Sequence, residues 1–344
     1  MLVVSSPRFA DHVTPPGHPE SPERADVLEA IAARAKARGE EVTAMRPATR
    51  QELLRVHTAA HVDAIEATRG HALMIDADTF TSPDTADVAL LAAGAAVQAV
   101  EAVLIDGDRP HRAAAALVRP PGHHAESARA MGFCIYNNVA VAAAHARARG
   151  VARVAVVDYD VHHGNGTQQM FYADPSVLYI STHQSPFYPG TGAATEIGER
   201  DGLGFTVNLP IEAGATDGDY RHVFERGVLR VLEQFRPVLL LISAGFDAHE
   251  QDPLAQMRMS SAGLAWITSE LRAMADRVSD GKVVLVTEGG YALSALGESL
   301  DLALIALAGD EADVAPDAMR PATGRGDRAL AEMKAAHAGR WSFQ

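Results

Sequence analysis

Residues 154–166 read VAVVDYDVHHGNG, a run of apolar residues that passes directly into a segment of Asp, His, Gly and Asn. The apolar part predicts a strand that is buried on both faces, because it is continuous rather than alternating. The polar part is short and rich in glycine, which is typical of a loop. A buried strand that runs directly into a polar loop is the feature that decides the fold, because it recurs along the chain.

The same transition from an apolar run to a polar loop occurs four more times. It is found in AAAALV-RPPGHHAES (113–127), VLYI-STHQSPFYPGTG (177–192), VLLLI-SAGFDAHEQDP (238–253) and VVLV-TEGGYAL (283–293), and another buried strand is predicted at 2–4. Helical patterns are found at 22–37, 84–105, 137–149, 219–234, 261–278 and 329–336. Strands that alternate with helices predict an α/β layered fold with a mainly parallel sheet. In such sheets ligands bind beyond the carboxyl ends of the strands, so we expect these loops to converge on one site.

The composition is that of an ordinary globular chain with an acidic surface. Of its 344 residues 47% are hydrophobic, and the formal net charge of −14 argues against nucleic acid as a partner. Cys134 is the only cysteine, which excludes an intramolecular disulfide, and the first residues lack the features of a secretory signal. The alanine-rich stretch 88–105 is interrupted by polar residues and is predicted to be a buried helix rather than a membrane span. We therefore expect a cytoplasmic protein without a membrane partner.

The chain has no evident internal repeat and no evident domain boundary. We predict a single domain over residues 1–344, with a core at about 1–305 and a C-terminal helical extension at 306–344. The polar stretch 309–327, rich in Pro, Gly and Asp, is expected to be a surface connection to the last helix. The sequence leaves the oligomeric state open.

Asp160 and His162 form an Asp-x-His pair directly after a predicted strand. Residues two apart point the same way in extended chain, so both side chains can face one ion, and Asp247 at the end of another strand can add a third ligand. Two carboxylates and one imidazole leave a coordination position open, as in catalytic zinc sites, and ferrous iron also suits this donor set. The alternative is that the pair only caps the next segment. The other polar residues at the same strand ends favour the metal site.

The tandem histidines His123 and His124 follow Pro-Pro-Gly, and Tyr291 follows two glycines, of which Gly290 is the second. Adjacent imidazoles can supply a general base and an electrostatic partner, and a phenol can donate to a polarised carbonyl oxygen. Each histidine needs an acceptor that fixes its tautomer, and the 154–166 segment offers candidates. The alternatives are structural histidines bonded to the backbone and a tyrosine packed in the core.

These segments, taken together, resemble the histone deacetylase superfamily, which includes bacterial histone deacetylase-like amidohydrolases and acetylpolyamine amidohydrolases. The matching segments are HPESPER (18–24), RPPGHH (119–124), GFCIYNNVAVAA (132–143), DYDVHHGNGTQ (158–168), FYPGTG (187–192), SAGFDAH (243–249), DPLA (252–255) and EGGY (288–291). One such match is weak, but the whole series in the same order is specific. The resemblance extends over about residues 1–305. It implies an arginase/deacetylase fold with an eight-stranded, mainly parallel sheet between helices.

The resemblance also implies a role for each matching residue. Asp160, His162 and Asp247 match zinc ligands. His124 matches the general base and His123 an electrostatic partner. Asp158 and Asn165 match the residues that orient His123 and His124, with Asn at 165 as in the class II-like branch. Tyr291 matches the tyrosine that polarises the carbonyl group.

Further matches imply the binding of substrate and of a second ion. Phe133 and Tyr188 match the two aromatic residues of an acyl-lysine tunnel, with Gly132 at its wall, Leu254 at its rim and Gly290 beside the tyrosine. The second aromatic is more often Phe, so Tyr188 is a departure that bears on polarity or substrate choice. The family also implies a structural K⁺ held by main-chain carbonyls around Asp158–His162, near Ser181.

The implied activity is a zinc-dependent deacylase that hydrolyses the amide of an acylated primary amine, such as acetyl-lysine. One alternative is an acetylpolyamine or other small-molecule amidohydrolase. The dimeric polyamine enzymes carry a long insertion where this chain has only the short stretch 69–83, which favours the first activity. A remote alternative is a non-catalytic binding protein of deacetylase-like fold, but no matching ligand or catalytic residue is missing.

Overall fold

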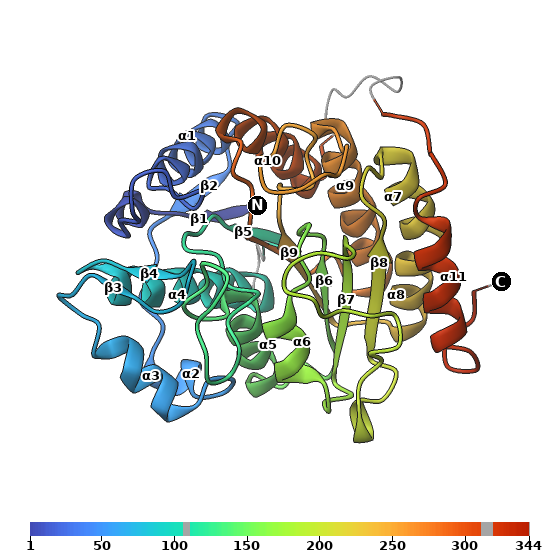
Figure 1. Ribbon diagram of the computed structural model, residues 1–344, viewed down its shortest axis with the longest axis horizontal. Helices are drawn as coiled ribbons and strands as arrows, with labels where there is room; N and C mark the ends of the chain where they lie inside the picture. The colour runs from blue at the N-terminus through green and yellow to red at the C-terminus, as the bar shows by residue number, and fades with distance from the viewer. Residues whose placement is uncertain (106–110, 311–318, 344) are drawn as a thin grey trace.

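The computed structural model describes residues 1–105, 111–310 and 319–343. Its centre is an eight-stranded sheet of order β2-β1-β5-β10-β9-β6-β7-β8, in which neighbouring strands run parallel (Figure 1). The strands are β1 (Leu2–Val4), β2 (Glu41–Thr43), β5 (Ala113–Ala116), β6 (Val154–Asp158), β7 (Val177–Gln184), β8 (Thr206–Ile211), β9 (Leu239–Ala244) and β10 (Val283–Thr287). The predicted fold class, a parallel sheet flanked by helices, is confirmed.

Helices cover both faces of the sheet (Figure 1). One face is covered by α4 (Thr85–Leu104), α5 (Asn138–Ala148) and α6 (Asn165–Phe171). The other is covered by α1 (Glu23–Ala37), α7 (Asp217–Val223), α8 (Leu229–Phe235), α9 (Ser261–Val278), α10 (Leu293–Ala308) and α11 (Asp327–Ala336). The remaining elements are α2 (Arg50–Leu53), α3 (Ala59–Glu66), the hairpin of β3 (Leu73–Met74) and β4 (Phe80–Thr81), and the short helical turns Pro7–Asp11 and Arg200–Gly202.

The core has two layers because successive strand residues point to opposite faces. Within β6, Val157 packs in the layer below α1 and α9, whereas Val156 packs in the layer below α4 and α5. Both side chains are fully buried. Coverage on both faces explains why the central strands are continuous apolar runs.

Four strands and several helices are not among the predicted elements; the strands are the two edge strands β2 and β8 and the two short strands of the β3–β4 hairpin. The edge strand β8 contains Asn208 and Pro210, which resemble loop residues in sequence, and proline is tolerated at an edge because one side of the strand needs no donor. The other edge strand, β2, is only three residues long. The predicted helix 219–234 is in fact two α-helices, α7 and α8, joined by a π-helical turn at Phe224–Val228.

Helix α4 is long and apolar enough to cross a membrane by length and composition alone, but 67% of its most apolar window is buried inside the molecule. It packs against β1, β5 and α5, and its alanines fill the layer between them. The prediction of a buried helix in this stretch is confirmed.

The C-terminal segment packs back on the core. Leu330 and Met333 of α11 are buried, and α11 contacts β8 and α7. The Trp341 indole N–H donates to the carbonyl of Gly204 at 3.0 Å. Because α10 ends at Ala308, the predicted start of the extension at 306 falls in its last turn. Residues 311–318 of the predicted surface connection lie outside the described residues.

Candidate active site

The loops that follow β5, β10, β9, β6 and β7 are neighbours, because these strands are consecutive in the sheet and parallel. The residues that the sequence singles out as catalytic, substrate-binding or metal-ligating lie on these loops or at the end of a strand, apart from Asn165, which is the first residue of α6 directly after the β6 loop. The structure therefore brings the loops together at the carboxyl edge, where the sequence predicts the site.

Asp160, His162 and Asp247 form a compact group beyond the ends of β6 and β9. One potential ligand atom from each residue lies within 4.8 Å of the others. His162 Nδ1 is 3.2 Å from Asp160 Oδ1 and 3.2 Å from Asp247 Oδ2. The two aspartates are at most 1% exposed and His162 is 9% exposed.

The electrostatics of this group suit a cation. Burial, together with the charge of Asp160, raises the pKa of Asp247 to about 7. Burial opposes the charge of His162, but hydrogen bonds to Asp160 and Asp247 outweigh it and raise the pKa of His162 to about 9. A divalent ion would offset two carboxylate charges that burial disfavours. Two oxygen donors and one nitrogen donor fit Zn²⁺ or Fe²⁺ with coordination positions left open.

Glycines and main-chain amides shape this cradle. A Cβ atom at Gly245 would lie 2.1 Å from Asp160 Oδ2, and one at Gly289 would lie 2.2 Å from Asp247 Oδ2. The amide of Gly289 donates to Asp160 Oδ2 at 2.8 Å, and the amide of Val161 donates to Asp247 Oδ1 at 2.9 Å. Such outer partners hold the carboxylates in one orientation, as is usual around metal ligands.

A second group of potential ligands, Glu52, Glu101 and His145, has a different character. The Arg46 guanidinium donates to both oxygens of Glu52, at 2.9 and 2.7 Å, and to Glu101 at 3.3 Å. Arg55 Nη1 lies 2.9 Å from His145 Nδ1. Two guanidinium groups already occupy the positions that a cation would take, so this group is an ion-pair network.

The tandem histidines each contact the partner that the sequence offers. His123 Nδ1 is 3.1 Å from Asp158 Oδ2, and His124 Nδ1 is 2.8 Å from Asn165 Oδ1. The two imidazole rings are 4.1 Å apart, and the His124 ring is 5.8 Å from that of His162. All of these side chains are buried. The pair therefore lies beside the metal-ligand group with both Nδ1 atoms held.

Their surroundings drive the two imidazoles toward opposite protonation states. Burial disfavours the charged form of His123, but Asp158 and Asp160 outweigh it and raise its pKa to about 10. Burial, followed by the charges of His123 and His162, lowers the pKa of His124 well below its usual value. One protonated and one neutral imidazole side by side is the pattern of an acid and a base.

Tyr291 is held through its main chain and its ring. Its amide donates to Asp252 Oδ2 at 2.7 Å, and the amide of Leu254, the residue predicted at the tunnel rim, donates to Asp252 Oδ1 at 3.0 Å. The Asp252 carboxylate therefore links the loop of Leu254 to the loop of Tyr291. The Arg24 guanidinium donates to the carbonyl of Gly290 at 2.8 Å and lies 5.1 Å from the centre of the Tyr291 ring. The φ of +125° at Gly290 requires glycine at this turn.

Two aromatic rings flank the histidines and Tyr291. The Phe133 ring lies 5.7 Å from the Tyr291 ring, and the Tyr188 ring lies 5.1 Å from the His124 ring, both edge-on. Gly132 has φ +56°, and a Cβ there would lie 2.6 Å from the His124 ring. Tyr188 is 38% exposed, whereas His124 is buried, so the Tyr188 ring lies between solvent and His124.

Sequence reasoning gave no role to Arg24, Glu288, Asp252 or Phe187. Glu288 is fully buried, and its Oε2 accepts hydrogen bonds from the amides of Gly122 at 2.6 Å and His123 at 3.0 Å. The Phe187 ring stacks on His162 at 5.1 Å. A usable signal was present for Glu288, since a charged residue directly after a strand predicted to be buried needs a partner.

Comparison with known proteins agrees with this geometry. The Histone deacetylase domain family matches residues 18–307. The chain is 38% identical over 307 residues to "Probable deacetylase" of Archaeoglobus fulgidus, covering 88% of this chain and 85% of that protein. It is 42% identical over 294 residues to "Histone deacetylase-like amidohydrolase" of Pseudomonas aeruginosa, covering 81% and 74%.

The fold of a solved relative agrees as well. The crystal structure of the HDA15 HD domain superposes with a TM-score of 0.88 at 36% sequence identity, covering 99% of this chain and 94% of that one. That structure has the arginase/deacetylase fold, which the resemblance in sequence implies for this chain. Family match, relatives and fold lead to one conclusion: this chain belongs to the histone deacetylase family of amidohydrolases.

Proposed function

We propose that the chain is a zinc-dependent deacylase that uses water to hydrolyse the amide of an acylated primary amine of the acetyl-lysine type. The observation that carries the proposal is the buried group of Asp160, His162 and Asp247, whose ligand atoms lie within 4.8 Å of one another beside the His124 ring. Zn²⁺ held by these residues would polarise the amide carbonyl and lower the pKa of a bound water from 15.7 toward roughly 7.

The other site residues then have distinct tasks. His124, whose environment keeps it neutral, takes a proton from the attacking water. The phenol of Tyr291 donates a hydrogen bond to the carbonyl oxygen as negative charge develops on it. His123, held protonated by Asp158, stabilises that charge electrostatically. A protonated histidine of the pair finally donates to the leaving amine.

Substrate access follows from the aromatic pair. Phe133 and Tyr188 form the walls of a tunnel for an acylated side chain, with Gly132, Leu254 and Gly290 around it. We further propose a structural K⁺ held by main-chain carbonyls of the segment from Asp158 to His162; Ser181 is paired with Asp158 in the sheet. We place this activity in the cytoplasm, without nucleic acid as partner.

The specific alternative is hydrolysis of an acetylated polyamine or another small amine. The stretch that would carry a polyamine-type insertion is here the short β3–β4 hairpin, at Leu73–Met74 and Phe80–Thr81. A short hairpin leaves room for a substrate larger than a polyamine, which supports acyl-lysine as the substrate.

The test is turnover by the metal-loaded protein of an acetyl-lysine peptide and of acetylspermidine at equal concentration, with bound metal measured alongside. We expect zinc bound to about one equivalent per chain and higher kcat/KM on the peptide. Asp247→Asn, which keeps the shape of the side chain and removes its charge, should lose both metal and turnover. Metal-free protein that turns over neither substrate after zinc is added would contradict the proposal, and faster turnover of acetylspermidine would favour the alternative.

A further inference from the structure

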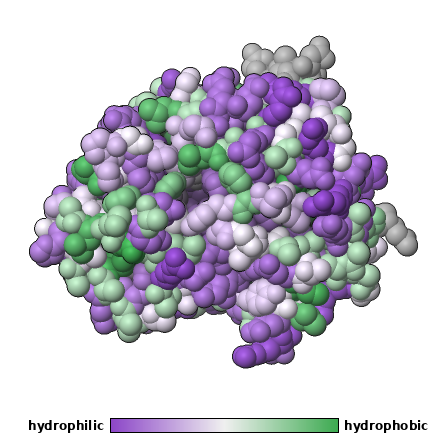
Figure 2. Space-filling model, viewed as in Figure 1, coloured by the Kyte–Doolittle hydropathy of each residue, from purple (hydrophilic) through white to green (hydrophobic). Residues whose placement is uncertain are grey.

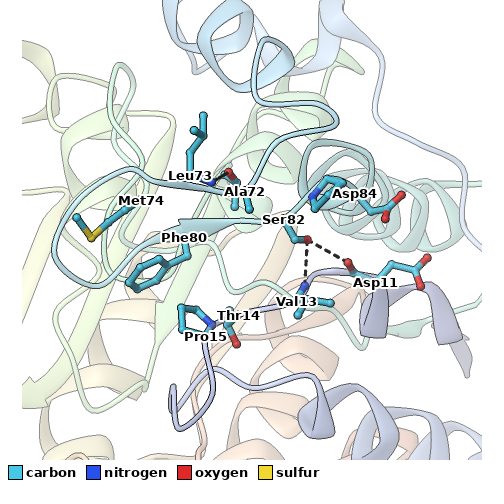
Figure 3. A pocket seen from close by; sticks show the side chains of 12 residues that line it. Asp11, Val13, Thr14, Pro15, Ala72, Leu73, Met74, Phe80, Ser82 and Asp84 are labelled. Carbon is cyan, nitrogen blue, oxygen red and sulfur yellow. Dashed lines mark hydrogen bonds between the residues drawn. The ribbon is translucent and has the colours of Figure 1, made fainter.

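An apolar groove lies outside the site described so far. A cavity of about 540 Å³ opens between the loop after Pro7–Asp11 and the β3–β4 hairpin, and Val13, Leu73, Met74 and Phe80 contribute apolar walls. In Figure 3, the Phe80 ring points from β4 toward Pro15, with Met74 beside it. Figure 2 shows apolar residues gathered over this side of the molecule.

The exposure of these side chains is high for apolar residues. Met74 is 69% exposed, Val13 55% and Leu73 48%, on a chain whose formal net charge is −14. Val13, Leu73 and Met74 line one cavity, and exposed apolar side chains that gather in one place rather than lying scattered are typical of a binding site.

The hairpin that lines the groove also supports the wall of the proposed tunnel. The amide of Phe133 donates to Thr79 Oγ1 at 3.1 Å, and His18 Nε2 lies 3.0 Å from the carbonyl of Asp78. The His18 ring is packed between two aromatic rings, 5.5 Å from Phe80 and 4.8 Å from Phe133, both edge-on. Groove and tunnel are therefore two sides of one packed unit.

The distance between groove and tunnel suits a polypeptide. The Phe80 ring of the groove and the Phe133 ring of the tunnel both pack on the His18 ring, so their centres are at most about 10 Å apart. An extended chain advances about 3.3 Å per residue, so a side chain two or three residues from an acylated lysine reaches the groove while the lysine occupies the tunnel. The two carboxylates that line the groove, Asp11 and Asp84, both lie against Arg8, at 2.8 and 4.0 Å, so they leave little net charge for the cationic chain of a polyamine. Exposed apolar walls that are separated from the tunnel only by the His18 ring instead match an apolar side chain on the same substrate molecule.

We propose that this groove is a subsite for an apolar side chain two or three residues from the acylated lysine in a polypeptide substrate. The inference rests on the proposed deacylase function and names its substrate class. Met74 and Leu73 are then specificity-determining residues that act on peptide binding and have no part in the chemistry.

The experiment compares three substrates with the zinc-loaded full chain: a small fluorogenic acetyl-lysine amide, and two acetyl-lysine peptides that differ only in Leu or Ser at positions two and three residues away. We expect the wild-type chain to favour the Leu peptide by about tenfold in kcat/KM, through KM, as for a side chain placed in an apolar pocket. Met74→Asp should abolish this preference and leave turnover of the small amide within about twofold. Leu203→Asp, a matched control at a turn where Leu203 is 41% exposed, should leave the preference intact.

The outcomes separate the two proposals. Equal kcat/KM on both peptides, with normal turnover of the small amide, overturns the subsite and leaves the deacylase function standing. Failure on all three substrates overturns both. If light scattering finds a wild-type dimer that Met74→Asp converts to a monomer while the peptide preference is unchanged, the groove is a surface between two copies and the subsite is overturned.

Discussion

Asn165 Oδ1 lies 2.8 Å from His124 Nδ1, and this contact fixes the tautomer of the imidazole. The amide nitrogen of Asn165 donates to Glu126 Oε1 at 2.8 Å, which assigns the orientation of the amide. An amide oxygen only accepts, so Nδ1 of His124 carries the proton and Nε2 keeps its lone pair. In the proposed mechanism, Nε2 of His124 is therefore the nitrogen that takes the proton from the attacking water.

Asn165→Ala should impair catalysis more than binding. Without its acceptor, His124 is free to rotate and to exchange tautomers, and we expect a loss of about 10- to 100-fold in activity, by analogy with the loss of a partner that orients a metal-bound histidine. We expect kcat to fall by that factor with KM changed less than about threefold. Glu126→Gln is the matched control, because it keeps an acceptor for the Asn165 amide while leaving His124 untouched. Wild-type turnover by Asn165→Ala would remove Asn165 from the mechanism.

Glu288→Ala should destabilise the fold and Glu288→Gln should not. The alanine variant leaves the amides of Gly122 and His123 buried without an acceptor, which costs roughly 1–3 kcal/mol for each such group. Glutamine still offers one oxygen to both amides and an NH₂ group to the Ser243 hydroxyl, which lies 3.2 Å from Glu288 Oε1. Urea unfolding of the three proteins measures the difference. Equal stability of the Ala and Gln variants would show that these hydrogen bonds contribute little.

Tyr291→Phe should retain metal and lose most turnover. Its ring contacts with Phe133 and Arg24 need no hydroxyl, so we expect the fold and the proposed metal ligands Asp160 and Asp247 to stay in place. Removing one donor to a developing oxyanion typically costs about 10²- to 10³-fold in kcat. Metal content from elemental analysis and kcat on an acetyl-lysine substrate are measured together. Full turnover in this variant would mean that the phenol does not reach the carbonyl oxygen.

The central strands could be predicted from the sequence because burial on both faces leaves a local mark, a continuous apolar run. The edge strand β8 leaves no such mark, because an edge tolerates the polar Asn208 and the donor-free Pro210. The helix at 219–234 was predicted as one element because its apolar spacing does not reveal the π-helical turn at Phe224–Val228.

In the site, too, the contacts made within one segment could be predicted and the contacts between distant segments could not. Asp160 and His162 are two residues apart on one loop, so their common direction follows from local geometry. Glu288 contacts Gly122 across 166 positions of sequence, and Arg24 contacts Gly290 across 266. No local sequence pattern predicts which buried charged side chain bonds to which main-chain group, so these two pairs could be identified only in the folded structure. The groove at Met74 is similar, since its walls come from two segments that meet only in the tertiary structure.

His57 should make the free energy of unfolding fall as the pH is lowered. Burial, with a smaller contribution from His61, lowers its pKa from the usual 6.5 to about 3. The neutral ring donates from Nδ1 to the carbonyl of Glu126 at 3.1 Å and accepts the amide of Asn137 at Nε2 at 3.0 Å, and a second proton would break the latter bond. The unfolded chain binds that proton from pH 6.5 downward, whereas the folded chain binds it only near pH 3. Stability is therefore lost as the pH falls through this window, by about 2 kcal/mol between pH 7 and pH 5.

His57→Gln is the matched variant, because glutamine offers a donor and an acceptor but does not titrate. The difference between the urea unfolding free energies of the wild type and of this variant, measured at each pH, isolates the contribution of His57 from that of the other histidines. Identical pH dependence in the two proteins would mean that His57 is charged in the folded state or that its neutral bonds are worth little.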